Sequence, residues 1–290
     1  MYKGLSRWGY AGLALLAVHV VLLFFPPVPP DVKGSLWSYL TGYCAIALLL
    51  AEAGRQRSAI ATGWAAVTSA RRWALGLGVT LAVLALAVAL RSLAPSLFAR
   101  FEREEGLFEP LTLFCYLGPA VMLFGMARAR TGAARKHWRF IAGLYLLLAL
   151  EEVDYFGIFG GLIGRVQGIY AGSLHDLILL AARGALATPA WALIGTLLLL
   201  IVVALWRLGY LQPGALIALA RSLDFLWVSM ALGFLLAGSA SEAGLFGLAV
   251  QPPTLEEALE LAGAICFFVY ALQLLAAEAS AVPRLSSPRT

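Results

Sequence analysis

Carboxylates and one histidine occur in four short clusters whose residue types suit cation binding or acid–base chemistry. They are Glu104-Glu105-Gly106-Leu107-Phe108-Glu109, Glu151-Glu152-Val153-Asp154, Ser173-Leu174-His175-Asp176 and Glu256-Glu257-Ala258-Leu259-Glu260. Carboxylate oxygens with at most one imidazole suit Ca²⁺, Mg²⁺ or Mn²⁺, and Zn²⁺ also tolerates such a set. Crowded acids repel one another unless protons or a cation compensate them. The clusters therefore predict a divalent-metal site.

Part of this acidic charge has a structural explanation. Glu109 directly precedes Pro110 and is expected at the N-cap of a helix, where a negative charge is favoured. Thr254 and Glu257 have the spacing of a capping box, and Ser173 with Asp176 form a variant of it. We therefore interpret Glu257 and Asp176 as structural.

The remaining acids are harder to explain by capping. Glu151 and Glu152 end an apolar run, where the helix dipole disfavours negative charge. Glu260 lies about one turn inside another apolar run, where a carboxylate is costly and marks a functional site. We predict Glu152 and His175 as catalytic residues. The predicted metal ligands are Glu105, Glu109, Glu151, Glu152, His175, Glu242, Glu256 and Glu260.

The composition places these residues in a membrane protein. Hydrophobic residues make up 61% of the 290 residues and charged residues only 13%, about half the share typical of soluble domains. The 18 arginines lie near the ends of apolar runs, which is typical of membrane proteins and does not indicate nucleic-acid binding. The three cysteines have no CxxC spacing, so neither disulfides nor a thiolate metal site is expected.

The apolar runs predict an all-α, polytopic bundle of about eight transmembrane helices, since a crossing needs roughly 20 apolar residues. The bundle forms one domain, residues 1–279, followed by a disordered tail, 280–290. A helix over 174–186 is too short to cross and is expected to be interfacial or re-entrant. The predicted spans are 8–25, 36–53, 73–94, 110–127, 138–156, 188–206, 223–246 and 255–277.

Charge orients this predicted bundle. Fifteen of the 21 Lys and Arg residues fall on the side that holds both termini, so the positive-inside rule puts the termini in the cytoplasm. Thirteen of the 16 acids fall on the opposite side, and the exceptions are Glu52, Asp224 and Glu278. All the predicted ligands should therefore meet at the outer face.

Other polar and aromatic residues have more ordinary interpretations. Six tryptophans near span ends, Trp8, Trp37, Trp73, Trp138, Trp206 and Trp227, are expected at the membrane interface. His19, midway along the first span, is expected to be a packing residue.

The middle third of the sequence resembles a widespread family of bacterial multi-pass membrane proteins without an established activity. Members carry an E-D-G-x-x-E element, a helix that ends in E-E-I-S-W-G-Q-R, and N-L-H-N. The counterparts here are Glu104–Glu109, Glu151–Gly157 and Ser173–Asp176, with departures at the Trp-Gly-Gln-Arg positions and at both Asn positions beside the histidine. The resemblance implies a multi-pass protein of the bacterial cytoplasmic (inner) membrane.

Three functions fit these residues. The first is divalent-metal-dependent hydrolysis or transfer on a lipid or lipid-linked substrate, with Glu152 or His175 as the general base. The second is metal-free acid–base chemistry on an apolar substrate. The third is non-enzymatic: a subunit or scaffold of a complex with other membrane proteins, or an ion or proton path. Membrane lipids are expected partners in every case.

Overall fold

The computed structural model describes residues 4–24, 36–101, 106–152, 165–166, 169–170, 188–222, 224–242 and 255–281. Within these ranges the chain is almost entirely α-helical, as its composition predicts. Besides short turns and connections, the described ranges contain a pair of two-residue strands, β1 (Arg165–Val166) and β2 (Ile169–Tyr170). They pair antiparallel, with Arg165 opposite Tyr170.

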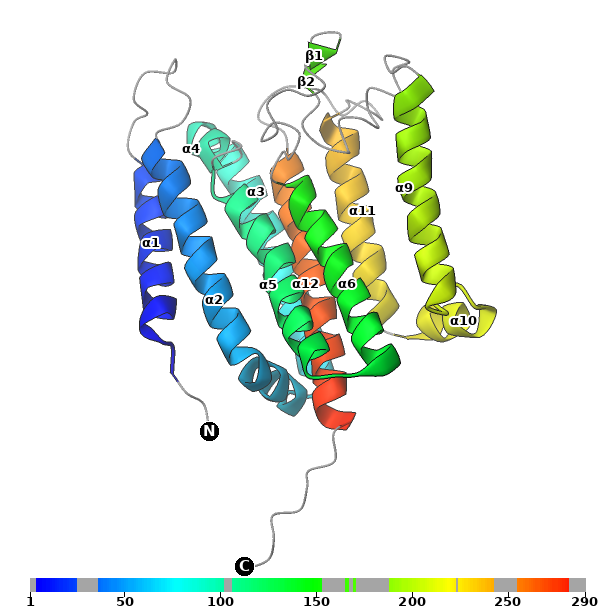
Figure 1. The fold of residues 1–290 in the computed structure, drawn as a ribbon. Helices are drawn as coiled ribbons and strands as arrows, with labels where there is room; N and C mark the ends of the chain where they lie inside the picture. Colours follow the sequence, from blue (N-terminus) through cyan, green and yellow to red (C-terminus); the bar gives the residue numbers. More distant parts are fainter. Residues whose placement is uncertain are drawn as a thin grey trace, which may run out of the picture.

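Eight of the described helices have 18 residues or more. Figure 1 shows successive long helices running in alternate directions, so the start of α1 and the end of α12 lie at the same end of the bundle. Two short helices, α4 (Pro95–Phe101) and α10 (Pro213–Arg221), lie at opposite ends. The long helices are α1 (Arg7–Phe24), α2 (Leu36–Ala66), α3 (Ser69–Leu93), α5 (Phe108–Arg128), α6 (Gly132–Glu151), α9 (Thr188–Arg207), α11 (Asp224–Glu242) and α12 (Glu256–Ala281).

Each of the eight predicted spans coincides with one long helix, but several boundaries differ. Helix α2 continues to Ala66 instead of ending near residue 53, because the stretch after Glu52 contains five Ala and two Arg residues, which favour helix. Helix α6 begins at Gly132, before the predicted residue 138. Helix α12 extends to Ala281, so the first two residues of the predicted tail are helical. The predicted helix over 174–186 lies outside the described residues.

Three of the described helices, α3, α5 and α12, are long and apolar enough to cross a membrane, and α1 and α11 are apolar but shorter by the same measure. Only 17% of the most apolar stretch of α3 is buried inside the bundle, against 56% in α5 and 61% in α12. Helix α3 therefore turns an apolar face outward, whereas α5 and α12 form the interior.

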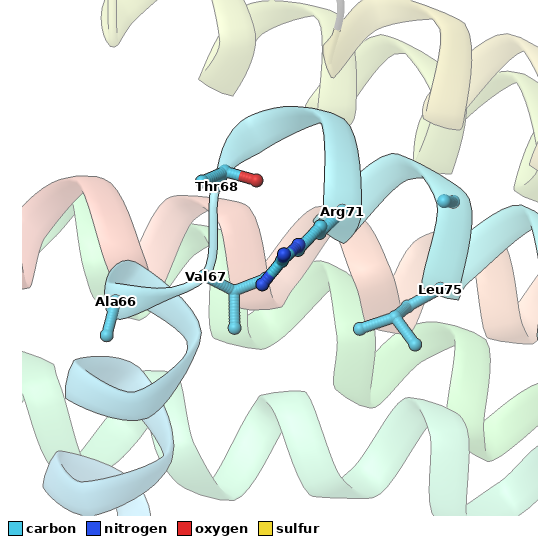
Figure 2. A pocket seen from close by; sticks show the side chains of 6 residues that line it. Ala66, Val67, Thr68, Arg71 and Leu75 are labelled. Carbon is cyan, nitrogen blue, oxygen red and sulfur yellow. The ribbon is translucent and has the colours of Figure 1, made fainter.

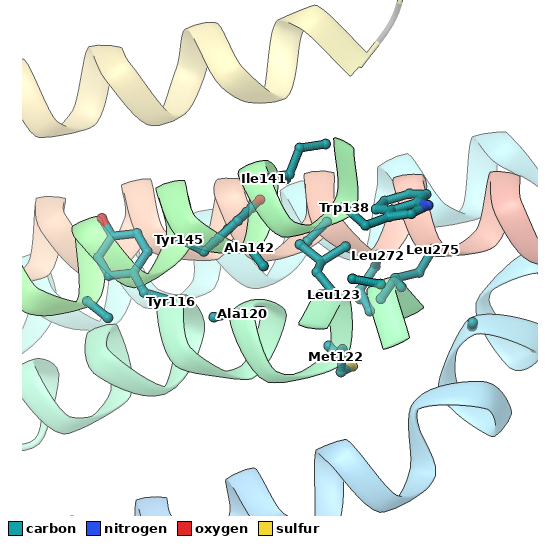
Figure 3. Packing of buried hydrophobic residues seen from close by; sticks show 14 of the residues in the cluster. Tyr116, Ala120, Met122, Leu123, Trp138, Ile141, Ala142, Tyr145, Leu272 and Leu275 are labelled. Atoms are coloured by element: carbon teal, nitrogen blue, oxygen red, sulfur yellow. The ribbon is translucent and has the colours of Figure 1, made fainter. Parts of the chain in front are cut away.

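Helix α12 is the centre of the bundle, since it packs against α2, α3, α5 and α11. Figure 3 shows the core that α12 shares with α5 and α6, where Leu123, Trp138 and Leu275 interlock. Alanines at the contacts, such as Ala142 and Ala271, are fully buried. Small side chains let helices approach closely, which is how helices associate where lipid replaces water.

The tryptophans divide into two groups that the sequence did not distinguish. Trp8 and Trp206 are each 64% exposed, as expected for side chains at an interface. Trp138 and Trp227 are instead buried in the bundle, so the interfacial prediction is wrong for them. The indole of Trp227 stacks on Trp73, with ring centroids 4.4 Å apart, against the backbone of Gly76.

Candidate functional site

The helix packing brings acids from three helices to one end of the bundle. Helix α5 begins, α6 ends and α12 begins at the end that also holds α4 (Figure 1). Because α5 contacts both α6 and α12, the acids at these helix ends become neighbours. We call this set the acidic cluster, and it consists of Glu109, Glu151, Glu152, Glu256, Glu257 and Glu260.

Glu152 and Glu257 each lie among other carboxylates of the cluster. The strongest electrostatic interactions of Glu152 are repulsive, and they come from Glu260, Glu109, Glu151 and Glu256, in decreasing order. Those of Glu257 come from Glu260, Glu152, Glu109 and Glu256. Glu109, Glu151, Glu256 and Glu260 therefore lie near enough to Glu152 to interact with it electrostatically.

The helix dipoles stabilise only part of the cluster. Glu109 lies in the first turn of α5, and Glu256 and Glu257 lie in the first turn of α12, where the positive end of the dipole favours a carboxylate. Glu151 is the last residue of α6, at the negative end of its dipole. The acids of α6 are therefore held in place against both neighbouring charge and the dipole.

Glu109 does not have the capping role expected from the sequence. The N-cap of α5 is Leu107, which makes no side-chain cap hydrogen bond, and Glu109 lies two positions later. Its Oε1 instead accepts a hydrogen bond of 2.7 Å from the hydroxyl of Tyr43 on α2. A second helix therefore supports this carboxylate.

Two buried polar groups near these acids lack hydrogen-bond partners. The Oε2 atom of Glu257 is buried and makes no hydrogen bond, so this residue is more than a helix cap. Thr112 is fully buried, and its hydroxyl is likewise without a partner. Thr112 lies one turn below Glu109 on α5, and such a spacing places both side chains on one face. An unsatisfied buried polar atom is costly, and both atoms can contact a ligand or a water molecule.

Aromatic side chains close the cluster toward the bundle interior. Tyr116 is almost fully buried and interacts electrostatically with Glu152 and Glu260. Tyr145 lies beside it at one end of the core (Figure 3), and its hydroxyl donates a hydrogen bond to the backbone carbonyl of Phe267. On the side that faces the bundle interior, the acids therefore border aromatic rings that carry tyrosine hydroxyls.

His19 and Gly106 fix the turn that leads into α5. The Nε2 atom of His19 lies 3.1 Å from the carbonyl oxygen of Gly106, and its Nδ1 atom lies 3.4 Å from the hydroxyl of Thr41. A Cβ atom at Gly106 would lie 2.1 Å from the carbonyl oxygen of Phe101, so only glycine fits there. These contacts agree with the packing role expected for His19.

Helix α11 approaches the cluster through a glycine. A Cβ atom at Gly238 would lie 3.4 Å from Cγ of Glu260, which is van der Waals contact, so this part of α11 lies directly beside Glu260 on α12. Glu242 is the last residue of α11, one turn beyond Gly238, but its side chain lies outside the described part of the structure. Glu105 and His175 also lie outside the described residues.

Among the described residues, no three His, Cys, Asp or Glu side chains are arranged to hold a metal ion. Sequence reasoning missed three contributors, Tyr43, Thr112 and Tyr116. The spacing of Thr112 and Tyr116 from Glu109, three and seven residues, offered a signal, since such positions share one helix face. No local signal marked Tyr43, which comes from a different helix.

At the opposite end of the bundle, arginine side chains neutralise the negative charge of the acids. There Glu52 is buried and forms an ion pair of 2.6 Å with Arg55, while the backbone N–H of Ser6 donates a further hydrogen bond to it. Glu278 forms an ion pair with Arg130. Two of the three acids expected on this side are thus paired with arginine, in contrast to the repulsion within the acidic cluster.

The three cysteines, Cys44, Cys115 and Cys266, are free. Comparisons of the sequence with protein families, with curated proteins and with solved structures gave no match.

Proposed function

We propose that this chain is a bacterial inner-membrane protein that crosses the membrane eight times and binds a divalent cation at the acidic cluster, where Glu105, His175 or Glu242 would complete the set of ligands. The bound cation would serve hydrolysis or transfer on a lipid or lipid-linked substrate. The observation that carries the proposal is that α5, α6 and α12 bring their acids to one end of the bundle, where Glu152 and Glu257 are surrounded by other carboxylates.

The alternate direction of the eight long helices supports the membrane arrangement. The apolar lengths of α3, α5 and α12 suit a crossing, and the other long helices lie beside them in the same bundle. An even number of crossings puts both termini on one side, and the excess of Lys and Arg there favours the cytoplasm. The acidic cluster would then face outward.

The unsatisfied polar atoms support a ligand within the cluster. Carboxylates that repel one another at a half-buried site need protons or a cation. The buried Oε2 atom of Glu257 and the hydroxyl of Thr112 are available to contact a ligand or its bound water. We favour a divalent ion, Ca²⁺, Mg²⁺, Mn²⁺ or Zn²⁺, because several carboxylates with one imidazole match the ligands of these ions.

The residues suggest how the chemistry would be divided. When bound, a divalent ion polarises a phosphoryl or carbonyl oxygen and lowers the pKa of its water. Glu152 or His175 would take up the proton that the nucleophile loses. Tyr43 would hold Glu109 in place through its hydrogen bond. At the depth of lipid headgroups, the substrate would be a headgroup or a lipid-linked group.

Metal analysis of the purified protein tests the site. We expect about one equivalent of a divalent ion in the wild type and its loss in Glu152→Gln and His175→Ala. Glu278→Gln is the matched control, since Glu278 lies at the other end of the bundle and is paired with Arg130. Equal metal content in all four proteins, or none in the wild type, would contradict the proposal.

Cysteine labelling tests the topology separately. In a variant whose three native cysteines are replaced by alanine, a membrane-impermeant maleimide should label Ser96→Cys in intact cells and leave Ala133→Cys unlabelled. Ser96 and Ala133 are both exposed, and they lie on α4 and at the start of α6, at opposite ends of the bundle. Labelling of both positions, or of Ala133→Cys alone, would overturn the orientation.

A further inference from the structure

A groove lies at the turn between α2 and α3, at the end of the bundle opposite the acidic cluster. Its volume is about 510 Å³, and it is lined by Ala66, Val67, Thr68, Arg71, Ala74 and Leu75. Figure 2 shows the guanidinium group of Arg71 extending across the groove toward Val67, with the hydroxyl of Thr68 at its edge. The groove thus combines one cation and one hydroxyl with an apolar lining.

The charge around the groove is positive. The first turn of α3 contains Arg71 and Arg72 and no acidic residue. Arg72 interacts electrostatically with Asp224 at the start of α11, which leaves Arg71 as the cation of the groove. The hydroxyl of Thr68 makes no cap hydrogen bond and can donate to a ligand. These groups suit a phosphate.

The apolar side of the groove continues along the bundle. Leu75 is 53% exposed and Val79, one turn further along α3, is 52% exposed. They belong to the outward apolar face of α3, which the bundle leaves largely uncovered. An occupant that matches both parts must carry a negative headgroup and a hydrocarbon chain.

We propose that the groove binds an anionic phospholipid, with its phosphate against Arg71 and Thr68 and one acyl chain along Leu75 and Val79. This inference rests on the proposal that α3 crosses the membrane, but not on the chemistry of the acidic cluster. A free phosphate ion would use only the polar part, and a zwitterionic phospholipid would bring, beside its phosphate, a quaternary ammonium whose positive charge is repelled by Arg71.

Native mass spectrometry of delipidated protein in detergent tests the groove. The probes are phosphatidylglycerol and phosphatidylcholine with identical acyl chains, added to wild type, Arg71→Gln and Arg91→Gln. Arg91 is the matched control, because it is an exposed arginine in the last turn of the same helix, at the opposite end. Arg71 is exposed, so its replacement leaves the core intact.

We expect wild type to retain phosphatidylglycerol more strongly than phosphatidylcholine. Arg71→Gln should lower phosphatidylglycerol retention about fivefold, the effect of one arginine near an anionic lipid surface, whereas Arg91→Gln should not change it. Leu75→Asn should weaken the binding of both lipids. Equal effects of the two arginine variants, equal retention of the two lipids, or displacement of the lipid by millimolar inorganic phosphate would overturn the proposal.

The outcome is independent of the acidic cluster. Arg71→Gln should keep the metal content of the wild type, so a failure of lipid binding leaves the cation proposal standing. If neither lipid binds to the wild type, the groove proposal fails.

Discussion

Replacing Glu257 by glutamine should stabilise the metal-free protein. The Glu257 carboxylate is repelled by Glu260 and Glu152, and its Oε2 atom is buried without a hydrogen bond. Two carboxylates about 6 Å apart at an effective dielectric constant of about 20 repel each other by roughly 3 kcal/mol. Partial protonation reduces this repulsion. We therefore expect Glu257→Gln to raise the free energy of unfolding by about 1–3 kcal/mol.

Thermal unfolding in detergent with EDTA measures this effect. For a chain of this size, each kcal/mol shifts the Tm by about 2–4 °C, so an increase of roughly 2–12 °C is expected. Glu278→Gln is the matched control, since it removes a carboxylate of the same helix that is paired with Arg130. Its Tm should stay the same or fall slightly, because a partly exposed ion pair contributes about 0–1 kcal/mol.

Adding a divalent cation should reduce the difference in stability between wild type and Glu257→Gln. A cation at 100 times its Kd stabilises the wild type by about 2.7 kcal/mol, and Glu257→Gln should gain less. If the Tm of Glu257→Gln in EDTA were below that of wild type and equal to that of Glu278→Gln, the inference that Glu257 lies in an unfavourable charge environment would be refuted. If the cation raised the Tm of wild type and of Glu257→Gln equally, Glu257 would not belong to the cation site.

Two further predictions concern the packing of the bundle. Gly76→Ala should lower the free energy of unfolding by about 1–3 kcal/mol, because the new Cβ would lie 2.6 Å from the ring of Trp227. Gly78→Ala is the control, since the space around Gly78 is open, and it should be neutral or stabilising. Denaturant unfolding of both variants measures the difference. His137, which precedes the predicted span 138–156, stacks on Tyr210 and shares a hydrogen bond with its hydroxyl. Burial lowers the pKa of His137, so its contribution to stability is fully present above its ordinary pKa of about 6.5 and is lost as the pH falls through the lowered value. The Tm should therefore fall between pH 7 and pH 5, and an unchanged slope in His137→Gln would contradict this assignment.

The sequence determined the helices because the signals for a membrane helix are local. An apolar run of sufficient length must form a helix that satisfies its own backbone in lipid. Every predicted span accordingly coincides with a helix. The errors lie at polar helix ends, such as the part of Leu36–Ala66 beyond residue 53, where the apolar run has ended but the residues still favour helix. The alternate direction of the spans also placed Glu109, Glu152 and Glu260 at one end.

Only the tertiary structure decided which side chains at a given depth touch. Capping rules explained Glu257 as structural, but the packing of α12 against α5 buries one of its oxygens among other acids. Tyr43 reaches Glu109 from α2, across 66 residues of sequence. Trp227 has the sequence context of an interfacial residue, yet it lies in the core beside Gly76. Helical periodicity gives the faces of one helix, whereas the choice of neighbours depends on how all the helices pack together.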